Sequence, residues 1–290
     1  MTIFRDLTQD ELDRAYDQRV WAPDAEALIA RHREASLAVR TRLPCRADLR
    51  YGPHPEERLD FFPAAGAGAP LVAFIHGGAW RNLSKEESCG AAETFVAAGA
   101  SFAALGFAKI PAVRLPEMVA QVRRAIAWLY RNAASLGADP ERLYLAGHSS
   151  GGHLAGCVLT TDWAKEHGLP AGILKGGLCM SGMYDLEPVM LSQRGAYLQL
   201  APDEIAAFSS RRRLAHLASP VLVAHGGRES PEFQRQAQDF AAALGAAGRL
   251  AGHVVLPAAN HFEVPFEFTR PDGILAGALL RMMRLAPHAG

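Results

Sequence analysis

The sequence predicts an α/β fold in which a mostly parallel, doubly wound sheet carries helices on both faces. Three observations support this prediction: short apolar runs recur after residue 70, helix-length segments separate them, and glycine-rich turns follow two of them. Continuous apolar runs are typical of parallel strands that are buried on both faces. The chain has 290 residues, of which 49% are hydrophobic and 21% charged, so a single domain over 1–290 is long enough to bury such a sheet.

Residues 1–45 are predicted to form a helical extension in front of the sheet. Thr8 and Glu11 have the spacing of a capping box, so a helix should begin directly after Thr8. A second helical pattern has apolar returns from Ala27 to Val39 and must stop before Pro44, because the residue before a proline is disfavoured in a helix.

The pattern changes after Pro44 to the period of two that a half-buried hairpin shows. Residues 47–51 and 58–62 alternate, and Gly52 and Pro53 can form the turn between them. Six continuous apolar runs then predict the parallel strands, at residues 71–75, 101–107, 143–146, 176–180, 221–224 and 254–256.

Two further segments complete the predicted architecture. The clearest helix between strands begins at Pro116, a favourable first-turn residue, and stops at Gly137. Residues 186–220 mix prolines and glycine with short helical pieces. Because this segment fits the alternation of strands and helices poorly, we expect a small cap-like insertion above the sheet.

Composition excludes several classes of function. Thirty Lys and Arg balance thirty Asp and Glu, so no basic field exists to hold nucleic acid, and the expected partner is a small-molecule substrate. The four cysteines form no CxxC pair, and His148 and His153 are not spaced as metal ligands, so neither a metal nor a cofactor is expected. No secretory leader or membrane-length apolar stretch is visible, which predicts a cytoplasmic protein that does not enter membranes. A homodimer is compatible with the sequence.

A predicted strand runs into a Gly-x-Ser-x-Gly turn and then a helix, over residues 143–153. This order is the signature of a nucleophile elbow, in which a sharp turn holds the serine at the helix N-terminus. Gly147 and Gly151 are expected there because the turn leaves no room for a Cβ. Ser149 is therefore the candidate nucleophile.

A second glycine-rich turn, His76-Gly77-Gly78-Ala79-Trp80, follows the strand that ends at residue 75. Acyl transfer needs backbone amides that point at a developing oxyanion, and a loop in this position supplies them next to the amide after the nucleophile. The candidate donors are Gly78, Ala79 and Ser150. Gly77 is an alternative, because sequence alone does not fix which amide points inward.

A serine nucleophile needs a histidine base and a carboxylate, in the chain order serine, acid, histidine for this kind of sheet. His261 follows the last predicted strand and is the candidate base, whereas His153, His167, His216 and His225 are expected to be structural or solvated. Glu229, which follows the strand at 221–224, is the favoured acid. Asp185, after the preceding strand, is the alternative.

These motifs together resemble the α/β-hydrolase fold and, within it, the arylformamidase (kynurenine formamidase) family. Two departures stand out: Glu229 lies where the family has aspartate, and residues 107–110 differ from the family's YDIAP-like stretch. Glutamate is the triad acid elsewhere in this fold, so we expect its role to survive. The matched segments are His76–Trp80 (HGGxW), His148–Leu154 (HSAGAHL), Ser181–Pro188 (SGxYDLEP), Glu229–Phe233 (DSPEF), Asn260–Phe262 (DHF), and N-terminal helices with Tyr16 and Trp21.

The resemblance implies a cofactor-free serine hydrolase that cleaves a small acyl amide, N-formyl-L-kynurenine or a related aryl formamide. His76 and Trp80 are expected to contact the substrate, since both flank the oxyanion loop. A carboxylesterase of short-chain esters is the alternative, because the same residues serve both reactions. A non-catalytic binding protein is disfavoured, since Ser149 and His261 are both present.

A substrate of the formylkynurenine type carries a carboxylate, which needs a cation or a set of hydrogen-bond donors in the pocket. Ser209, Ser210 and the arginines at 211–213 lie where the insertion would meet the pocket. Three adjacent arginines are typical of a solvated surface, which is the favoured interpretation. The alternative is that one of these arginines or serines binds the carboxylate.

Overall fold

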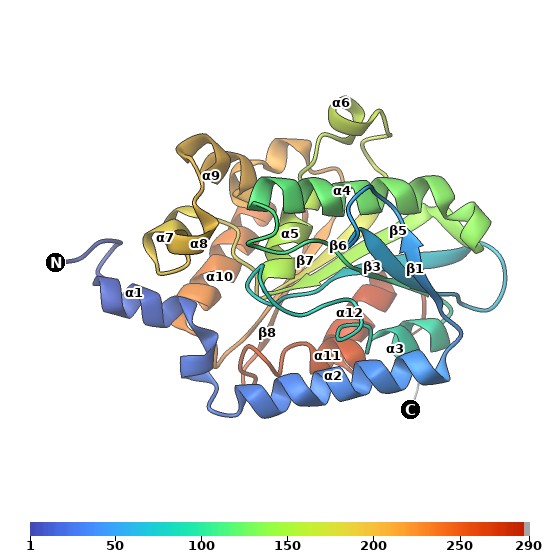
Figure 1. The fold of residues 1–290 in the computed structure, drawn as a ribbon, viewed down its shortest axis with the longest axis horizontal. Coiled ribbons are helices and arrows are strands. Elements are labelled where there is room, and N and C mark those ends of the chain that lie inside the picture. Colours follow the sequence, from blue (N-terminus) through green and yellow to red (C-terminus); the bar gives the residue numbers. More distant parts are fainter. Residues whose placement is uncertain (287–290) are drawn as a thin grey trace.

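The computed structural model describes residues 1–286, and these contain an eight-stranded sheet between two layers of helices (Figure 1). The order is β1-β2-β4-β3-β5-β6-β7-β8; β2 is antiparallel to β1 and to β4, and all other neighbours are parallel. The mostly parallel sheet predicted from the apolar runs is therefore confirmed. The strands are β1 (Arg46–Arg50), β2 (Arg58–Phe62), β3 (Ala69–Ile75), β4 (Ser101–Leu105), β5 (Ala138–His148), β6 (Leu174–Met180), β7 (Val221–Gly226) and β8 (Leu250–Leu256).

Helices pack on both faces of this sheet, α4, α5 and α10 on one and α2, α3, α11 and α12 on the other. Short helices and turns occupy the long connections. The α-helices are α1 (Gln9–Tyr16), α2 (Ala25–Arg42), α3 (Ala92–Ala97), α4 (Leu115–Asn132), α5 (Ser150–Leu159), α6 (Trp163–His167), α7 (Glu187–Leu191), α8 (Gly195–Leu198), α9 (Pro202–Phe208), α10 (Pro231–Ala246), α11 (Phe266–Thr269) and α12 (Ile274–Met282).

The core explains why the strands read as continuous apolar runs. In β3, Leu71 and Ile75 pack in the cluster beneath α4 and α5, while the intervening Val72 and Phe74 pack in the opposite cluster beneath α3 and α12. Successive side chains of a strand point to opposite faces, so a strand that is covered on both faces needs an apolar residue at every position.

The edge strand β8 is longer than its sequence pattern predicts. It begins at Leu250 rather than at Val254, because its first half is largely exposed and carries no continuous apolar run. Leu250 and Val255 remain 37% and 45% exposed. Exposure of an edge strand removes the burial signal on which the prediction depends.

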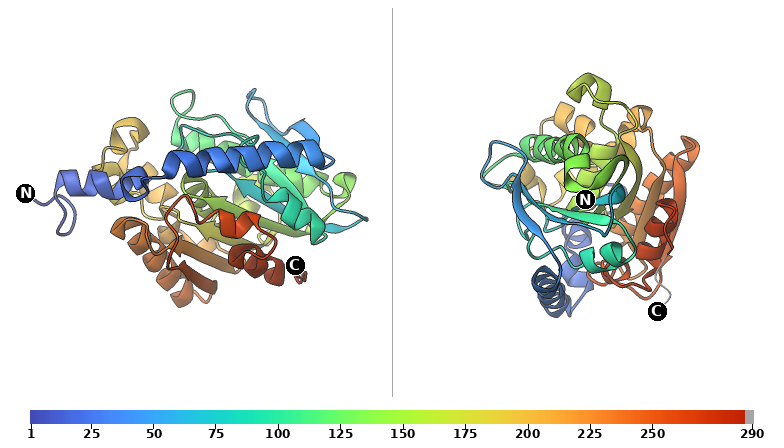
Figure 2. Two further views of the ribbon diagram at one scale, coloured as in Figure 1. Left: turned by 90° about the horizontal axis from the view of Figure 1, so that it is seen from below. Right: turned by 90° about the vertical axis from the view of Figure 1, so that its right-hand side faces the viewer.

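The N-terminal extension lies along the molecule, with α2 crossing beneath the sheet (Figure 2). Its first helix begins as predicted, because Thr8 and Glu11 form a complete capping box. Asp60 in β2 is fully buried and binds Arg40 of α2, while Lys85 Nζ lies 2.9 Å from its other oxygen. A buried carboxylate needs such cations, so this cluster anchors α2 to the sheet.

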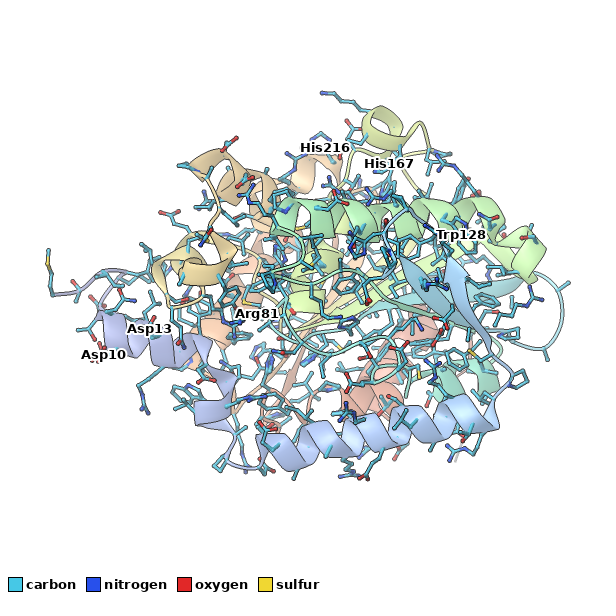
Figure 3. The ribbon with its side chains drawn as sticks, viewed as in Figure 1. Asp10, Asp13, Arg81, Trp128, His167 and His216 are labelled. Carbon is cyan, nitrogen blue, oxygen red and sulfur yellow. The ribbon has the colours of Figure 1, made fainter. Side chains whose placement is uncertain are left out.

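The segment 186–220 forms α7, α8 and α9 with two short 3-10 turns, at the end of the molecule where α1 lies (Figure 1). Asp13, labelled on α1 in Figure 3, accepts a hydrogen bond from the amide of Gln193, between α7 and α8. The extension and the insertion therefore contact each other. Within residues 1–286, no helix is long and apolar enough to cross a membrane.

Candidate active site

Ser149 lies in the sharp turn between β5 and α5, with a φ of +57° that is unusual for a residue other than glycine. The two flanking glycines make this turn feasible. A Cβ on Gly147 would lie 2.2 Å from the Gly151 carbonyl oxygen, and one on Gly151 would lie 2.1 Å from the Ile75 carbonyl oxygen. The turn directs the Ser149 Oγ toward Nε2 of His261, 2.9 Å away.

His261 follows β8 in a loop and is 4% exposed. Its backbone carbonyl accepts a hydrogen bond from Nε2 of His148, at 3.1 Å. Burial, with the neighbouring His261 and His32, holds the pKa of His148 well below its usual value. His148 is therefore neutral with its proton on Nε2, since a carbonyl can only accept. The bond from His148 therefore fixes the loop that carries His261. The imidazole ring of His261 packs edge-on against Phe233.

Glu229, directly after β7, is the carboxylate beside this imidazole. Its Oε1 lies 3.7 Å from Nδ1 of His261 and accepts hydrogen bonds from the Gly226 amide, at 3.1 Å, and from the Ser181 hydroxyl. Asp185 is instead occupied by Arg211 and Arg212. The structure thus places Glu229, and not Asp185, next to the candidate base.

The glycine-rich turn after β3 lies against the nucleophile elbow. Gly78 and Ala79 have φ angles of +106° and +52°, and among residues 1–286 neither amide donates a hydrogen bond to a protein acceptor. Ser150 begins α5, where the first amides of a helix are unpaired. The Trp80 amide donates to the Ser150 hydroxyl, at 3.2 Å, which joins the two turns.

The position of Trp80 corrects the expectation that its side chain contacts the substrate, whereas His76 lies in the cavity wall. Trp80 is 1% exposed, lies outside the cavity lining, and donates from its indole nitrogen to Nδ1 of His153 at 3.2 Å. His76 borders the cavity but is 2% exposed and stacks on Phe107. Trp80 thus supports the loop from beneath, since its indole packs in the core.

A cavity of about 300 Å³ opens in front of these groups, with Ser149, His148 and His261 in its wall. Aliphatic and aromatic side chains form much of the remaining wall, and a few charged residues lie among them. An apolar cavity with few convergent polar groups is typical of a small-molecule site. The apolar lining residues include Ile29, Phe74, Leu83, Phe262, Pro265 and Phe268.

The N-terminal extension supplies one side of this cavity. Asp17, Gln18, Arg19, Ile29, His32 and Ser36 all line it. His32 on α2 lies 3.0 Å from the Phe262 carbonyl oxygen through Nε2, and its ring stacks on Phe266 at 3.8 Å. Burial lowers the pKa of His32, so the ring is a neutral donor to that carbonyl. Helix α2 therefore also braces the loop that carries His261.

Comparison with known proteins gives relatives over the full chain. Kynurenine formamidase from Danio rerio is 30% identical over 98% of this chain and 99% of its own, and the protein of the same name from Salmo salar is also 30% identical, over 98% and 99%. Residues 59–169 match the BD-FAE family model. The chain belongs to the kynurenine formamidase family of α/β-hydrolases. It is a serine hydrolase, as the resemblance of its motifs predicts.

Solved structures share the fold of this chain. A candidate thioesterase from Silicibacter sp. TM1040 superimposes with a TM-score of 0.82 at 26% identity, over 92% of this chain and 98% of that one. Esterase B from Lactobacillus rhamnosis shares the fold, with a TM-score of 0.69 at 17% identity, over 90% and 96%. The α/β-hydrolase fold is thereby confirmed.

The sequence relatives also include an esterase. Esterase LipQ from Mycobacterium tuberculosis is 27% identical over 83% of this chain and 64% of its own.

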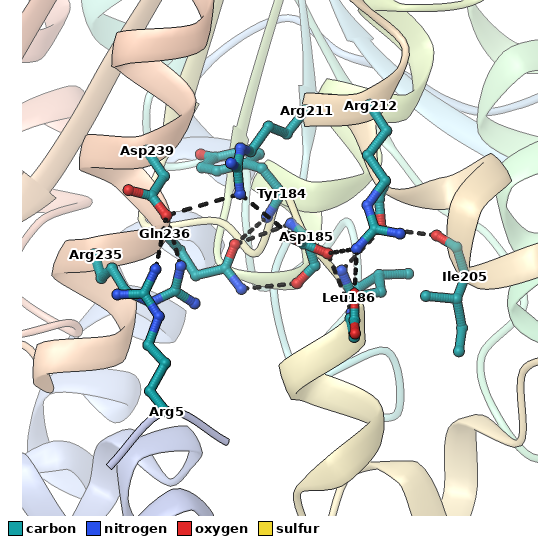
Figure 4. A network of polar contacts seen from close by, with 12 residues as sticks. Arg5, Tyr184, Asp185, Leu186, Ile205, Arg211, Arg212, Arg235, Gln236 and Asp239 are labelled. Carbon is teal, nitrogen blue, oxygen red and sulfur yellow. Dashed lines mark hydrogen bonds and ion pairs between the residues drawn. The ribbon is translucent and has the colours of Figure 1, made fainter. Parts of the chain in front are cut away.

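The arginines at 211–213 do not line this cavity, which argues against the alternative that one of them binds a substrate carboxylate. Arg211 and Arg212 pair with Asp185, and Arg212 also contacts Glu187, in the network of Figure 4. None of the three arginines lines the cavity, and neither do Ser209 and Ser210, which are buried. The sequence places these arginines next to the insertion, but it does not show that Asp185 and Glu187 pair with two of them.

None of the side chains of His153, His167, His216 and His225 lines the cavity. His167 and His216 are near α6 at the edge of the molecule (Figure 3). His153 is buried beneath Trp80, and His225 bonds to its neighbour Gly226. Within residues 1–286, no group of three His, Cys, Asp or Glu side chains is arranged to hold a metal ion.

Sequence reasoning missed several residues of this site. His148 belongs to the matched elbow segment, but the motif alone does not indicate that its ring bonds to the loop that carries His261. Ser181 lies in a matched family segment with no assigned role, although its hydroxyl reaches Glu229. Arg194 and the residues of α2 enter the cavity through long-range packing, which leaves no local pattern.

Proposed function

We propose that this protein hydrolyses an aryl formamide, N-formyl-L-kynurenine or a close analogue, to the free amine and formate. The observation that carries the proposal is the cavity of about 300 Å³ with the Ser149–His261 pair in its wall. This volume is at the small end for ligand sites, which suits a compact aromatic substrate better than a long acyl chain. The full-length kynurenine formamidase relatives support the same choice.

The chemistry follows from the neighbours of Ser149. Nε2 of His261 takes the hydroxyl proton while Oγ attacks the formyl carbon. Amides of Gly78, Ala79 and Ser150 bind the oxyanion of the tetrahedral intermediate. The imidazolium then gives its proton to the aryl nitrogen, and the C–N bond breaks to leave a formyl ester on Ser149. Water, deprotonated by His261, attacks this ester and releases formate.

In this scheme Glu229 orients the imidazole and stabilises its charged form, since its carboxylate faces Nδ1. The substrate ring would lie against Phe262, Phe268 and the apolar side of α2, which border the cavity. A formyl group is small enough to fit under the oxyanion loop, where Gly78 is tightly packed against Asn82.

Hydrolysis of short-chain esters is the second candidate, supported by the match to the BD-FAE model and by the esterase relatives. The two reactions use the same residues and differ in the leaving group. The test that separates the two reactions compares kcat/KM for N-formyl-L-kynurenine with kcat/KM for p-nitrophenyl acetate on one preparation. A higher kcat/KM for the ester would favour ester hydrolysis as the function.

The test of the nucleophile is Ser149→Ala, which should lower kcat for N-formyl-L-kynurenine by about 10⁴-fold or more. Ser135→Ala is the matched control, because Ser135 is exposed and its hydroxyl bonds only to the local Asn132 carbonyl. Near-normal turnover by Ser149→Ala would refute the serine mechanism. Covalent labelling of Ser149 by an organophosphate, located by peptide mass spectrometry, gives the positive counterpart.

A further inference from the structure

Arg194, at the start of α8, is a cation without a carboxylate partner in the wall of the cavity. It lines the same cavity as Ser149 and His261. Its Nε donates to the Tyr16 carbonyl oxygen at 3.0 Å, and Nη2 donates to the same oxygen. Among residues 1–286, no Asp or Glu oxygen lies within ion-pairing distance of its guanidinium.

The other arginine of this cavity, Arg19, is paired with Glu26 at 2.9 Å, and Glu87 is paired with Arg33. Asp17 is an anion of the cavity without an ion-pair partner among residues 1–286, and its carboxylate accepts a hydrogen bond from the Arg19 amide. A partly buried cation without a counter-charge is costly in the free protein unless an anion binds to it. Arg194 is therefore the group of the cavity that an anionic ligand would neutralise.

The guanidinium of Arg194 is held in a defined orientation before any ligand binds. Its Cζ lies 5.8 Å from the centre of the Trp80 ring and 5.9 Å from that of the Phe233 ring, within range of cation–π attraction. The bonds to the Tyr16 carbonyl use Nε and one N–H of Nη2, while Nη1 lies 3.9 Å from the Met183 sulfur, and the Tyr197 side chain also lies beside the guanidinium. A fixed planar fork of this kind matches a carboxylate.

Arg194 lies near the candidate base as well as in the same cavity. The Phe233 ring contacts both the His261 imidazole, with ring centres 5.0 Å apart, and the Arg194 guanidinium. One aromatic ring thus contacts both the candidate base and the cation. In N-formyl-L-kynurenine the formamide and the ketone chain that ends in the amino-acid carboxylate are on adjacent carbons of one ring, so both ends of the substrate lie on the same side of it.

We infer that Arg194 binds a carboxylate of the substrate and so selects anionic aryl amides over neutral ones. This inference rests on the proposed function and deepens it, by assigning a residue to substrate specificity. Arg194 would contribute mainly to substrate affinity, because the carboxylate carries the same charge in the ground state and in the transition state.

The test compares two formamides with the same ring and ketone: N-formyl-L-kynurenine, which has the carboxylate, and 2′-formamidoacetophenone, which lacks it. Arg194→Gln should raise KM for the first by about ten- to a hundredfold, with kcat little changed, and should leave the second within about twofold. Arg194→Lys should fall between wild type and Arg194→Gln, since it keeps the charge but loses the fork. Arg212→Gln, outside the cavity, is the matched control and should change neither substrate.

Activity on the neutral formamide shows that each variant is folded, and thermal unfolding provides a second check. Equal losses on both substrates, or no loss on either, would overturn the inference. If wild type hydrolyses p-nitrophenyl acetate but neither formamide, the proposed function fails instead. Competitive inhibition of that ester reaction by L-kynurenine then still tests Arg194: a Ki raised about tenfold or more in Arg194→Gln supports it, and an unchanged Ki refutes it.

Discussion

Oε1 of Glu229 lies 3.7 Å from Nδ1 of His261 and is also the oxygen that Ser181 and the Gly226 amide hold. Both Nδ1 of His261 and the second carboxylate oxygen, Oε2, are buried without a hydrogen-bond partner among the described residues. The carboxylate is therefore positioned by two donors of its own and faces the imidazole from just beyond hydrogen-bond distance. A small movement of either side chain would bring the two groups into contact when the imidazole becomes charged.

This arrangement predicts that Glu229→Gln lowers kcat by about 10²- to 10⁴-fold, because a neutral amide neither stabilises the imidazolium nor fixes its tautomer. Asp185→Asn, the matched control, should keep turnover within a few-fold, since Asp185 pairs with Arg211 and Arg212. Steady-state kinetics on N-formyl-L-kynurenine measures both variants. A larger loss in Asp185→Asn would reverse the assignment of the acid.

Ser181 is predicted to position Glu229 rather than to contact the substrate. Removing its hydroxyl in Ser181→Ala should lower kcat by about tenfold with KM unchanged, as for the loss of one hydrogen bond to a charged group. In a Glu229→Gln background the same change should have little further effect, because the carboxylate that it positions is gone. Losses that multiply in the double variant would show that Ser181 acts independently of Glu229.

The strands and the nucleophile elbow could be predicted from sequence because their causes are local. A central strand covered on both faces must be apolar at each position, and the Ser149 turn needs glycine on both sides. The chain order of serine, acid and histidine then limited the candidates for base and acid to a few residues. The structure brings Ser149, His261 and Glu229 together in one cluster.

The cavity walls could not be predicted in the same way, because they depend on packing between distant segments. Arg194 points into the cavity while Arg212 binds Asp185, and nothing in the local sequence distinguishes the two arginines. Trp80 follows the oxyanion turn, but a φ of +61° at that residue directs its indole toward His153. Helix α2 reaches the cavity because Asp60 anchors Arg40.

The oxyanion loop is predicted to depend on glycine at position 78 for two reasons. Its φ is +106°, and a Cβ would lie 2.1 Å from the Asn82 carbonyl oxygen, so Gly78→Ala must displace the loop. We expect kcat to fall by about 10²- to 10³-fold, as when an oxyanion donor is lost. Gly99→Ala is the control that adds backbone strain without a steric clash. Gly99 also has a positive φ, +87°, but no atom lies within 4 Å of an added Cβ.

Gly99→Ala should therefore lower the free energy of unfolding by about 1 kcal/mol and leave kcat unchanged, since only backbone strain is added. Urea denaturation and steady-state kinetics on the two variants provide the comparison. Full activity in Gly78→Ala would mean that the loop tolerates the displacement and that its amides do not bind the oxyanion.

The buried histidines predict that stability falls on acidification. Burial lowers the pKa of His153 to about 4, and the neutral ring is matched to its neighbours: Nδ1 accepts from the Trp80 indole and the protonated Nε2 donates to the Phe208 carbonyl. Burial likewise lowers the pKa of His76 to about 4. Between pH 6.5 and pH 4 the unfolded chain binds protons at these residues and the folded chain does not, so the stability present above pH 6.5 is lost as the pH falls.

Each of these two histidines should contribute a slope of up to about 1.4 kcal/mol per pH unit in that window. His153→Gln removes one titrating group while an amide can still bond to the Trp80 indole and the Phe208 carbonyl. The free energy of unfolding of the variant should therefore depend less steeply on pH than that of wild type. Urea denaturation at about pH 4.5, 5.5, 6.5 and 7.5, a range that reaches below the reference pKa of about 6.5, measures it. Parallel curves for the variant and wild type would show that His153 does not resist protonation in the folded protein, because a histidine that titrates alike in both states adds no slope.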